Sequence, residues 1–366
     1  MEMPLNHTIF FKGKEAFLNN DLKEAEYFFS QSYKNERNPK SLWYLLYIYL
    51  LQSEYEKIAR LFLLKKIEIR GFGLYPVYWV KYLSGDLDEA LEILERMMEE
   101  DHYFVRIFAI KELSKFKKID NVDEFIKDRF KYFGLSYEFP IEEQRASLYL
   151  DFLSKRYHLS MIQAKSLLKD YPEISDVYLD YLEICFAVGT EEAKKEALKN
   201  EAILEKAKTD YRVMWLLARE FYQRKEFDLS KEYISRLLSV FRHNPLFYYN
   251  LGNIFFNKGK YIKAIECYTL ASELAPLFDR VYHNLGVLYY KIGEINKAIK
   301  SFEKAISISK NPHSIYNIAV CYIEKREYET AYHYLNKIPN WMNDFKYSPY
   351  FLKEKIKEFL VTSLIT

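Results

Sequence analysis

Apolar side chains recur along residues 245–276 at the spacing of two short helices. One set follows an i, i+3, i+4, i+7 pattern and so forms a single stripe of a helix: Tyr248, Leu251, Gly252 and Phe255. A second stripe contains Ala264, Tyr268 and Ala271, and Pro276 ends it. Gly259 lies between the two stripes and favours a turn. The stretch therefore predicts two antiparallel helices joined by a tight turn.

The same pattern returns along the C-terminal half with a period of about 34 residues. A small residue stands at the eighth position of each unit, in steps of 34, 34 and 33, at Ala218, Gly252, Gly286 and Ala319. Small residues at position 20 follow in the last three units, at Ala264, Ala298 and Ala331. Small side chains at both positions let two helices approach closely, while larger neighbours fill the space beside them. Four regular helix pairs are expected between residues 211 and 338.

More degenerate units precede the regular ones. Helix pairs are expected over 6–39, 141–171 and 175–208, and two more are expected between residue 40 and the end of a clear helix at 86–99. In the pair at 175–208, the second helix should run from Glu191 to Ala207. Helices near 103–117 and 122–133 carry no repeat signature, and the segment 134–140 predicts a kink that could act as a hinge. A final amphipathic helix near 350–363 would cover the open end of the array.

These units resemble the tetratricopeptide repeat (TPR), most strongly over residues 211–338. The resemblance implies an all-α fold, a right-handed superhelical solenoid of about 8–9 stacked antiparallel helix pairs with a C-terminal capping helix. This one continuous solenoid is predicted to have four divisions: degenerate N-terminal repeats at 1–134, middle repeats at 141–209, a regular TPR array at 210–340 and a C-terminal capping helix at 346–366.

Composition and motifs argue against several classes of function but do not identify one. The charges of the 54 basic and 52 acidic residues nearly cancel. The net charge is therefore not expected to attract nucleic acid or an anionic membrane. The chain contains no P-loop, GxGxxG, HExxH or GxSxG motif, and its three cysteines show no metal-ligand spacing. We predict a non-enzymatic cytoplasmic protein without a cofactor or metal. The most apolar run, at 42–51, is too short to cross a membrane.

The candidate binding site follows from the resemblance, because the first helix of each TPR unit lines the concave groove of that family. Position 6 of three successive units holds an asparagine, at Asn250, Asn284 and Asn317. An asparagine side chain both donates and accepts hydrogen bonds, so it can pair with the backbone of an extended peptide. The remaining candidates in this groove are Asn253, Arg212, Trp215, Arg219, Tyr249, Arg280 and Lys291. They predict a protein or peptide partner that is acidic or ends in a free carboxylate.

Two interpretations of the asparagines stay open. They can bind a ligand, or they can tie neighbouring helices together. The carboxylate clamp of chaperone-binding TPR domains is matched only in part, because Tyr249, His313 and Asn317 stand where basic residues are expected. The predicted function is a scaffold or adaptor; the alternative is a peptide-gated regulator of a transcription or signalling partner. The apolar N-terminal counterparts Tyr44, Ile48 and Leu51 suggest a hydrophobic partner surface, a self-association face or tight packing, and packing is favoured.

Overall fold

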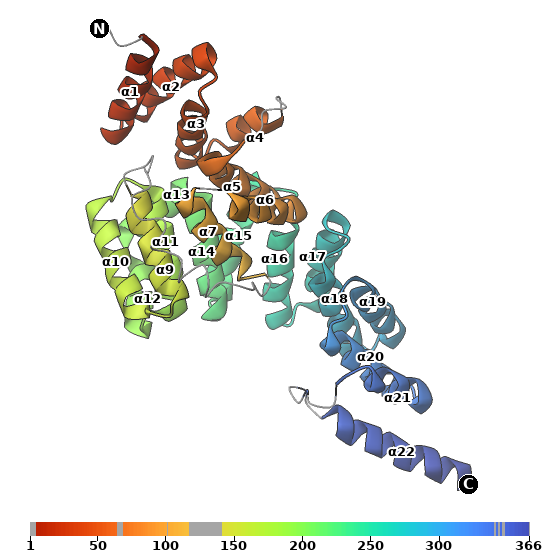
Figure 1. Ribbon diagram of the computed structural model, residues 1–366. Helices are drawn as coiled ribbons and strands as arrows, with labels where there is room; N and C mark the ends of the chain where they lie inside the picture. The colour runs from red at the N-terminus through yellow and green to blue at the C-terminus, as the bar shows by residue number, and fades with distance from the viewer. Residues whose placement is uncertain are drawn as a thin grey trace. The chain divides into compact units, whose positions relative to one another are not determined.

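The computed structural model describes residues 5–63, 69–100, 102–116, 141–339, 342, 345 and 348–365. Every regular element within these ranges is a helix, and most helices form antiparallel pairs (Figure 1). The predicted all-α, TPR-like fold class is therefore confirmed. The expected helix at 122–133 and the expected kink at 134–140 lie outside the described residues.

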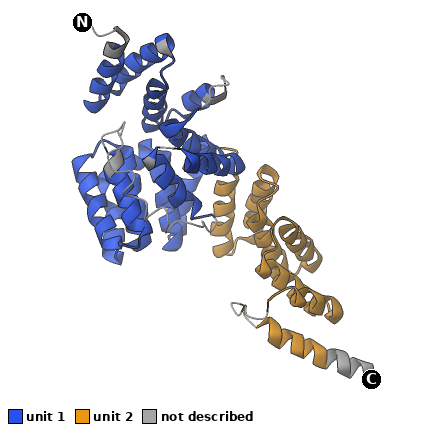
Figure 2. Ribbon diagram, in the orientation of Figure 1, with its two compact units in different colours: residues 1–241 blue, residues 242–366 orange. Residues whose placement is uncertain are grey.

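The chain divides into two compact units, unit 1 from Met1 to Phe241 and unit 2 from Arg242 to Thr366 (Figure 2). The regular repeats predicted from residue 211 onward are thus shared between the units. The first regular pair belongs to unit 1, and the next three pairs belong to unit 2.

Unit 1 consists of helix pairs and some single helices. They are α1 (Leu5–Leu18), α2 (Leu22–Glu36), α3 (Pro39–Leu51), α4 (Tyr55–Leu63), the short 3-10 helix η1 (Gly71–Gly73), α5 (Leu74–Ser84), α6 (Leu87–Glu99), α7 (Tyr103–Leu113), α9 (Glu142–Leu153), α10 (Tyr157–Asp170), α11 (Ser175–Val188), α12 (Glu191–Lys199), α13 (Glu201–Thr209), α14 (Tyr211–Gln223) and α15 (Phe227–Val240). The sequence explains several of their ends. Asp21, for example, caps α2 by accepting a hydrogen bond from the Glu24 backbone N–H at 3.0 Å.

The single helix predicted from Glu191 to Ala207 was wrong, because Asn200 divides it into α12 and α13. Asn200 adopts an extended conformation, with φ −69° and ψ 116°, and so ends the first helix. Its side chain then accepts a hydrogen bond from the Ile203 backbone N–H at 3.2 Å and starts the second helix. Asparagine competes for backbone hydrogen bonds in this way, and the run of charged residues around it carried no packing constraint to reveal the break.

Contacts between distant parts of the sequence close unit 1 on itself. The Ser53 hydroxyl after α3 donates a hydrogen bond to the Thr209 carbonyl at the end of α13. The Tyr55 ring lies 5.8 Å from the Tyr211 ring and 5.5 Å from the Phe241 ring, centroid to centroid. The second helix pair therefore packs against helices more than 150 residues later in the chain.

Unit 2 holds the most regular repeats and a long final helix. Its helices are α16 (Pro245–Asn257), α17 (Tyr261–Leu274), α18 (Asp279–Lys291), α19 (Ile295–Ile308), α20 (Pro312–Glu324), α21 (Tyr328–Asn336) and α22 (Pro349–Ile365). Asn244 and Asn311 cap α16 and α20, and each is followed by a proline at the first helical position, where no backbone donor is needed. Helix α22 packs on α21 through the buried Ile356.

The small residues at position 8 permit close contact with an aromatic ring of the second helix. A Cβ atom added at Gly252 would lie 2.6 Å from the Tyr268 ring, and one added at Gly286 would lie 2.6 Å from the Phe302 ring. The residue pressed against each glycine is thus the aromatic residue at position 24. The alanines at position 20, Ala264 and Ala298, are fully buried beside this contact.

Candidate partner-binding site

The first helices of unit 1 meet around a buried ionic network, which we define as Tyr47, Tyr75, Arg145, Tyr149, Asp176, Asp180, Asp210 and Arg212. Asp176 of α11 lies at its centre. Its carboxylate accepts hydrogen bonds from the Tyr47 hydroxyl, from the Tyr75 hydroxyl at 2.8 Å and from Arg212 Nη1 at 2.8 Å. Arg145 Nη1 lies 3.4 Å from the same carboxylate.

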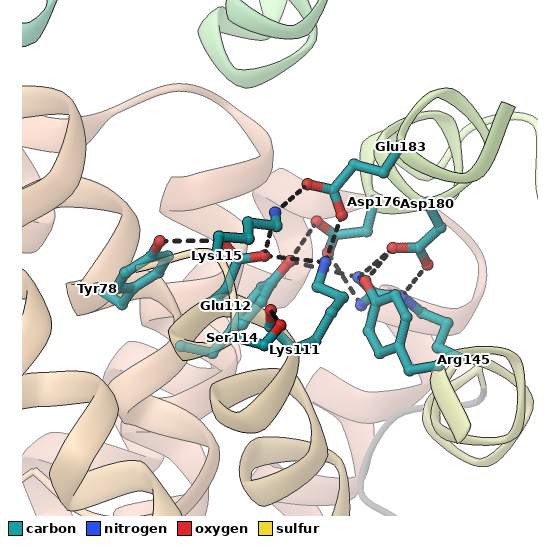
Figure 3. Close-up of polar contacts among 11 residues, drawn as sticks. Tyr78, Lys111, Glu112, Ser114, Lys115, Arg145, Asp176, Asp180 and Glu183 are labelled. Carbon is teal, nitrogen blue, oxygen red and sulfur yellow. Dashed lines mark hydrogen bonds and ion pairs between the residues drawn. The ribbon is translucent and has the colours of Figure 1, made fainter. Parts of the chain in front are cut away.

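Each arginine of the network also has a second carboxylate. Arg145 donates to Asp180 from Nε at 2.6 Å and from Nη2 at 3.2 Å. Arg212 donates to Asp210 from Nε at 3.0 Å and from Nη2 at 2.6 Å. Figure 3 shows Arg145 reaching Asp180 across the gap between α9 and α11. The arginine fork is suited to such two-point pairing, which holds the facing helices in one register.

Burial and charge act in opposite directions on Asp176. Burial by itself raises the pKa of its carboxyl group, but Arg145 and Arg212, together with the hydrogen bonds from Tyr47 and Tyr75, lower the pKa below its usual value. The carboxylate is therefore held in its charged form within the protein. A charge in such a place is tolerated only because it is paired and hydrogen-bonded.

Arg212 and Trp215 were predicted to face a groove, and the structure places both in the interior of unit 1. Arg212 is 0 % exposed and Trp215 is 4 % exposed. The physical reason is that unit 1 closes on itself, so that its facing first helices fill the intervening space with their own ion pairs and rings. Tyr44 and Ile48, at 1 % and 0 % exposed, pack in the same interior. Arg219, one turn beyond Trp215, remains exposed.

Two lysines and two glutamates form a second cluster beside the network, which we call the lysine cluster: Lys111, Glu112, Lys115 and Glu183. Lys111 Nζ pairs with Glu183 and, at 3.0 Å, with Glu112. Lys115 Nζ lies 2.8 Å from both of these carboxylates. Figure 3 shows the lysines between carboxylates that come from α7 and α11. The cluster thus joins these two helices at their carboxyl ends.

The contribution of the lysine cluster to stability is expected to depend on pH. Burial raises the pKa of Glu183, but Lys111 and Lys115 outweigh burial, and the folded pKa lies well below the usual value. A group with a lowered folded pKa stabilises the fold above its unfolded pKa and loses that contribution as pH falls. Glu183→Gln should cost about 2 kcal/mol at pH 7 and progressively less between about pH 5 and pH 2.

Urea unfolding of both proteins at several pH values, followed by circular dichroism, measures this difference. Glu205→Gln is the matched control, because Glu205 pairs with Lys208 on the exposed surface. Its effect should stay within about 0.5 kcal/mol at every pH. A Glu183→Gln cost that does not change with pH would contradict the assignment.

In unit 2 the first helices α16, α18 and α20 form what we call the asparagine face. Asn253 and Asn284 are linked there through Tyr268 of α17. The Tyr268 hydroxyl donates to Asn253 Oδ1 at 2.6 Å, and Asn284 Nδ2 lies 3.0 Å from that oxygen and 3.2 Å from the Tyr268 hydroxyl. These hydrogen bonds tie one repeat to the next. They support the structural interpretation for this part of the ladder.

The other ladder asparagines make fewer contacts between helices. Asn250 Nδ2 donates to the Leu246 carbonyl of its own helix at 2.6 Å. No hydrogen bond joins the Asn317 side chain to another described residue. Asn250, Asn284 and Asn317 are all partly exposed. The face therefore keeps amide groups within reach of solvent in three successive repeats.

The remaining predicted residues surround this face in different ways. The Tyr249 ring lies 5.0 Å from Phe278 and 5.8 Å from Tyr268 and so packs within the repeat. Arg280, in the first turn of α18, is exposed. Lys291, at the end of α18, is also exposed, and its ammonium lies 5.5 Å from the Phe256 ring. The three ladder asparagines, Tyr249, Arg280 and Lys291 all belong to first helices of unit 2.

Sequence reasoning missed the ionic network, although a signal for part of it was present. Asp176, Asp180 and Glu183 are spaced i, i+4, i+7 along α11, which is otherwise mostly apolar. This spacing puts the three acids on one stripe of a buried helix, and such acids need cationic partners. The partner arginines could not be identified in the same way, because they lie 35 and 36 residues from the acids that they contact.

The described residues contain no group of three or more histidine, cysteine or acidic side chains placed to hold a metal ion. Within those ranges, no helix combines the length and the apolar character that crossing a membrane requires.

Comparison with known proteins supports the repeat architecture. One family model described as a TPR repeat matches residues 252–293, and one described as a tetratricopeptide repeat matches residues 280–312. No curated protein matches the chain.

Several solved structures are similar in fold. Cut9, in the crystal structure of the APC/C hetero-tetramer Cut9–Hcn1, is 13 % identical with a TM-score of 0.54, and the match covers 96 % of this chain and 76 % of that one. Pseudomonas aeruginosa pilF is 22 % identical over 51 % of this chain and 84 % of its own, with a TM-score of 0.45. Yeast Tom70 is 14 % identical over 96 % and 80 %, with a TM-score of 0.42. At these identities the likeness concerns the fold alone. The two family matches, together with the fold shared with Cut9, show that this chain carries tetratricopeptide repeats.

Proposed function

We propose that this protein is a non-enzymatic scaffold that binds an extended segment of a partner protein on the asparagine face of unit 2. Tetratricopeptide repeats serve protein–protein interaction, which supports the general class of function. One observation carries the choice of surface. The amides Asn250, Asn284 and Asn317 remain partly exposed in successive repeats, whereas the facing first helices of unit 1 bury their polar groups in ion pairs.

The chemistry of this face favours backbone recognition. The Asn284 amide nitrogen is engaged by Asn253 and Tyr268, and this fixes the side chain while its own oxygen remains an acceptor. A side chain already held in place loses less entropy when a ligand binds. Spaced amides of this kind suit the alternating donors and acceptors of an extended peptide.

Charge around the face favours an acidic partner. Arg280 and Lys291 are exposed at opposite ends of α18. Glu324 lies at the end of α20 and shares a hydrogen bond with Tyr290. Burial together with this contact raises the pKa of Tyr290 to about 12. An acidic peptide with two spaced carboxylates could meet both cations, and a free carboxyl terminus could meet one of them. We place this interaction in the cytoplasm.

The test is peptide-array binding by the full chain, followed by affinity measurement of the selected peptides. The triple variant Asn250→Ala, Asn284→Ala, Asn317→Ala should weaken a selected peptide at least about tenfold, because each lost hydrogen bond is worth about 0.5–1.5 kcal/mol. Lys300→Ala, at an exposed position of α19, should bind as wild type does.

A second variant separates binding from packing. Tyr268→Phe removes the hydroxyl that bridges Asn253 and Asn284 and leaves the ladder amides in place. It should lower the thermal midpoint more than it lowers affinity. If the triple variant lowers the midpoint and binds every selected peptide as tightly as wild type, the ladder is structural and the proposed site fails.

The peptide-gated regulator remains the alternative function. The segment 134–140, which we predicted as a possible hinge for such a regulator, lies outside the described residues. No observation in either unit favours it over the scaffold.

A further inference from the structure

A pocket of about 280 Å³ lies in unit 1 where the carboxyl ends of four first helices meet. Its walls come from α7, α9, α11 and α14. The apolar part of the lining consists of Phe152, Ile184, Phe186, Ala187 and Leu216. The polar part includes Lys111, Lys115 and Glu183 of the lysine cluster, together with Arg219 and Glu220. The pocket therefore combines an apolar wall with a charged rim.

The charges of the rim do not cancel. Glu183 is paired with both Lys111 and Lys115, and Glu220 lies 3.6 Å from Arg224. Arg219 is exposed, and its guanidinium lies 6.0 Å from the Trp215 ring. No described carboxylate pairs with Arg219. This arginine is consequently a cation at the pocket that a ligand carboxylate could neutralise.

The size of the pocket limits what it can take. Pockets for drug-sized ligands measure roughly 300–1,000 Å³, so 280 Å³ suits a single bulky side chain. Lys111 and Tyr149, which form part of the lining, are buried. Ala187, Arg219 and Gln223 are exposed, so a side chain can enter past them.

We propose that this pocket binds a bulky apolar side chain that stands directly beside an aspartate or glutamate in an extended segment of a partner protein. The apolar side chain packs on the wall formed by Phe152, Ile184 and Leu216. The adjacent carboxylate pairs with Arg219. Desolvated anchors of this kind carry most of the affinity at protein interfaces. The inference rests on the proposed role in partner binding, but it uses no residue of unit 2.

The probe is an array of Gly/Ser peptides that carry one central dipeptide, with Asp-Phe, Asp-Leu, Lys-Phe and Asp-Ser compared. The full chain should retain Asp-Phe or Asp-Leu and reject Lys-Phe and Asp-Ser. Fluorescence anisotropy then measures the affinity of the retained peptides. Arg219→Glu, which reverses the charge, and Ala187→Trp, which fills the pocket from an exposed position, should each weaken binding at least tenfold.

Arg236→Glu is the matched control and should bind as wild type does. Arg236 is also exposed, and its guanidinium lies 5.9 Å from the Tyr233 ring, much as Arg219 lies over Trp215, but it does not line the pocket. The proposal is overturned if no peptide is retained, if retention ignores the acid or the apolar residue, or if both pocket variants bind normally. Loss of binding only in the triple asparagine variant would overturn this pocket and leave the proposed function intact.

Discussion

Replacing Arg212 with methionine is expected to lower the free energy of unfolding of unit 1 by about 3–5 kcal/mol. Arg212 is 0 % exposed, and its guanidinium pairs with Asp210 and Asp176. Methionine has a similar length but no charge, so two buried carboxylates would lose a cation. Asp176 would keep its hydrogen bonds from Tyr47 and Tyr75, but its one remaining cationic partner would be Arg145, at the longer distance of 3.4 Å. Uncompensated buried charge of this kind is among the costliest single changes.

A charge-balanced variant tests that mechanism. Arg212→Met combined with Asp176→Asn and Asp210→Asn removes the charges together, and it should recover part of the stability lost by Arg212→Met alone. Lys208→Met is the surface control, because Lys208 pairs with Glu205 in the exposed part of α13, and it should change stability by no more than about 0.5 kcal/mol.

Urea unfolding combined with amide hydrogen exchange on the full chain reads unit 1 and unit 2 separately. Exchange should accelerate in the helices of the ionic network and stay unchanged in α18 and α19. If Arg212→Met proves as stable as wild type, the ionic network does not stabilise unit 1. Arg212 would then again be a candidate for ligand binding.

Gly286→Leu is expected to destabilise unit 2 by about 1–3 kcal/mol or more. Even a Cβ atom at this position would lie 2.6 Å from Cδ1 and Cε1 of Phe302. Phe302 is 1 % exposed, so its ring has no free space into which it can move. The helices α18 and α19 would have to separate, and the buried contacts of Ala298 and Phe302 would weaken.

Thermal unfolding of the full chain, followed by circular dichroism, measures the effect. Gly259→Asn is the matched control, since a side chain there meets nothing within 4 Å and asparagine tolerates its φ of +71°. The control should cost less than about 1 kcal/mol. Equal midpoints for Gly286→Leu and wild type would show that α18 and α19 do not meet at this glycine.

The repeats could be predicted because their signal is local. The positions of Gly252, Ala264 and Tyr268 fall within one 34-residue unit, and the same contacts recur in the next unit. A helix pair that packs on itself leaves its whole pattern within a short window. The split at Asn200 escaped prediction for the opposite reason, because the surrounding Lys- and Glu-rich stretch buries few side chains and so carries little pattern.

The candidate site could be predicted only where the family geometry holds. Asn250, Asn284 and Asn317 occupy the same position of three regular repeats, and all three remain partly exposed in unit 2. Arg212 and Trp215 occupy comparable positions of the preceding repeat, yet they lie in the interior of unit 1. Arg212 pairs there with Asp176, a residue of another repeat that no local pattern connects to it.

The sequence by itself determined the regular helix pairs from residue 211 onward and the repeat family, because spacing along a helix and small residues at the crossings act within tens of residues. The tertiary structure alone decided which first-helix faces stay accessible. In unit 1 the chain returns upon itself, so Arg145, Asp176 and Arg212 neutralise one another away from solvent. In unit 2 the face with Asn250 and Asn317 keeps its amides partly exposed. Accessibility depends on contacts between residues far apart in the chain, and those contacts exist only after folding.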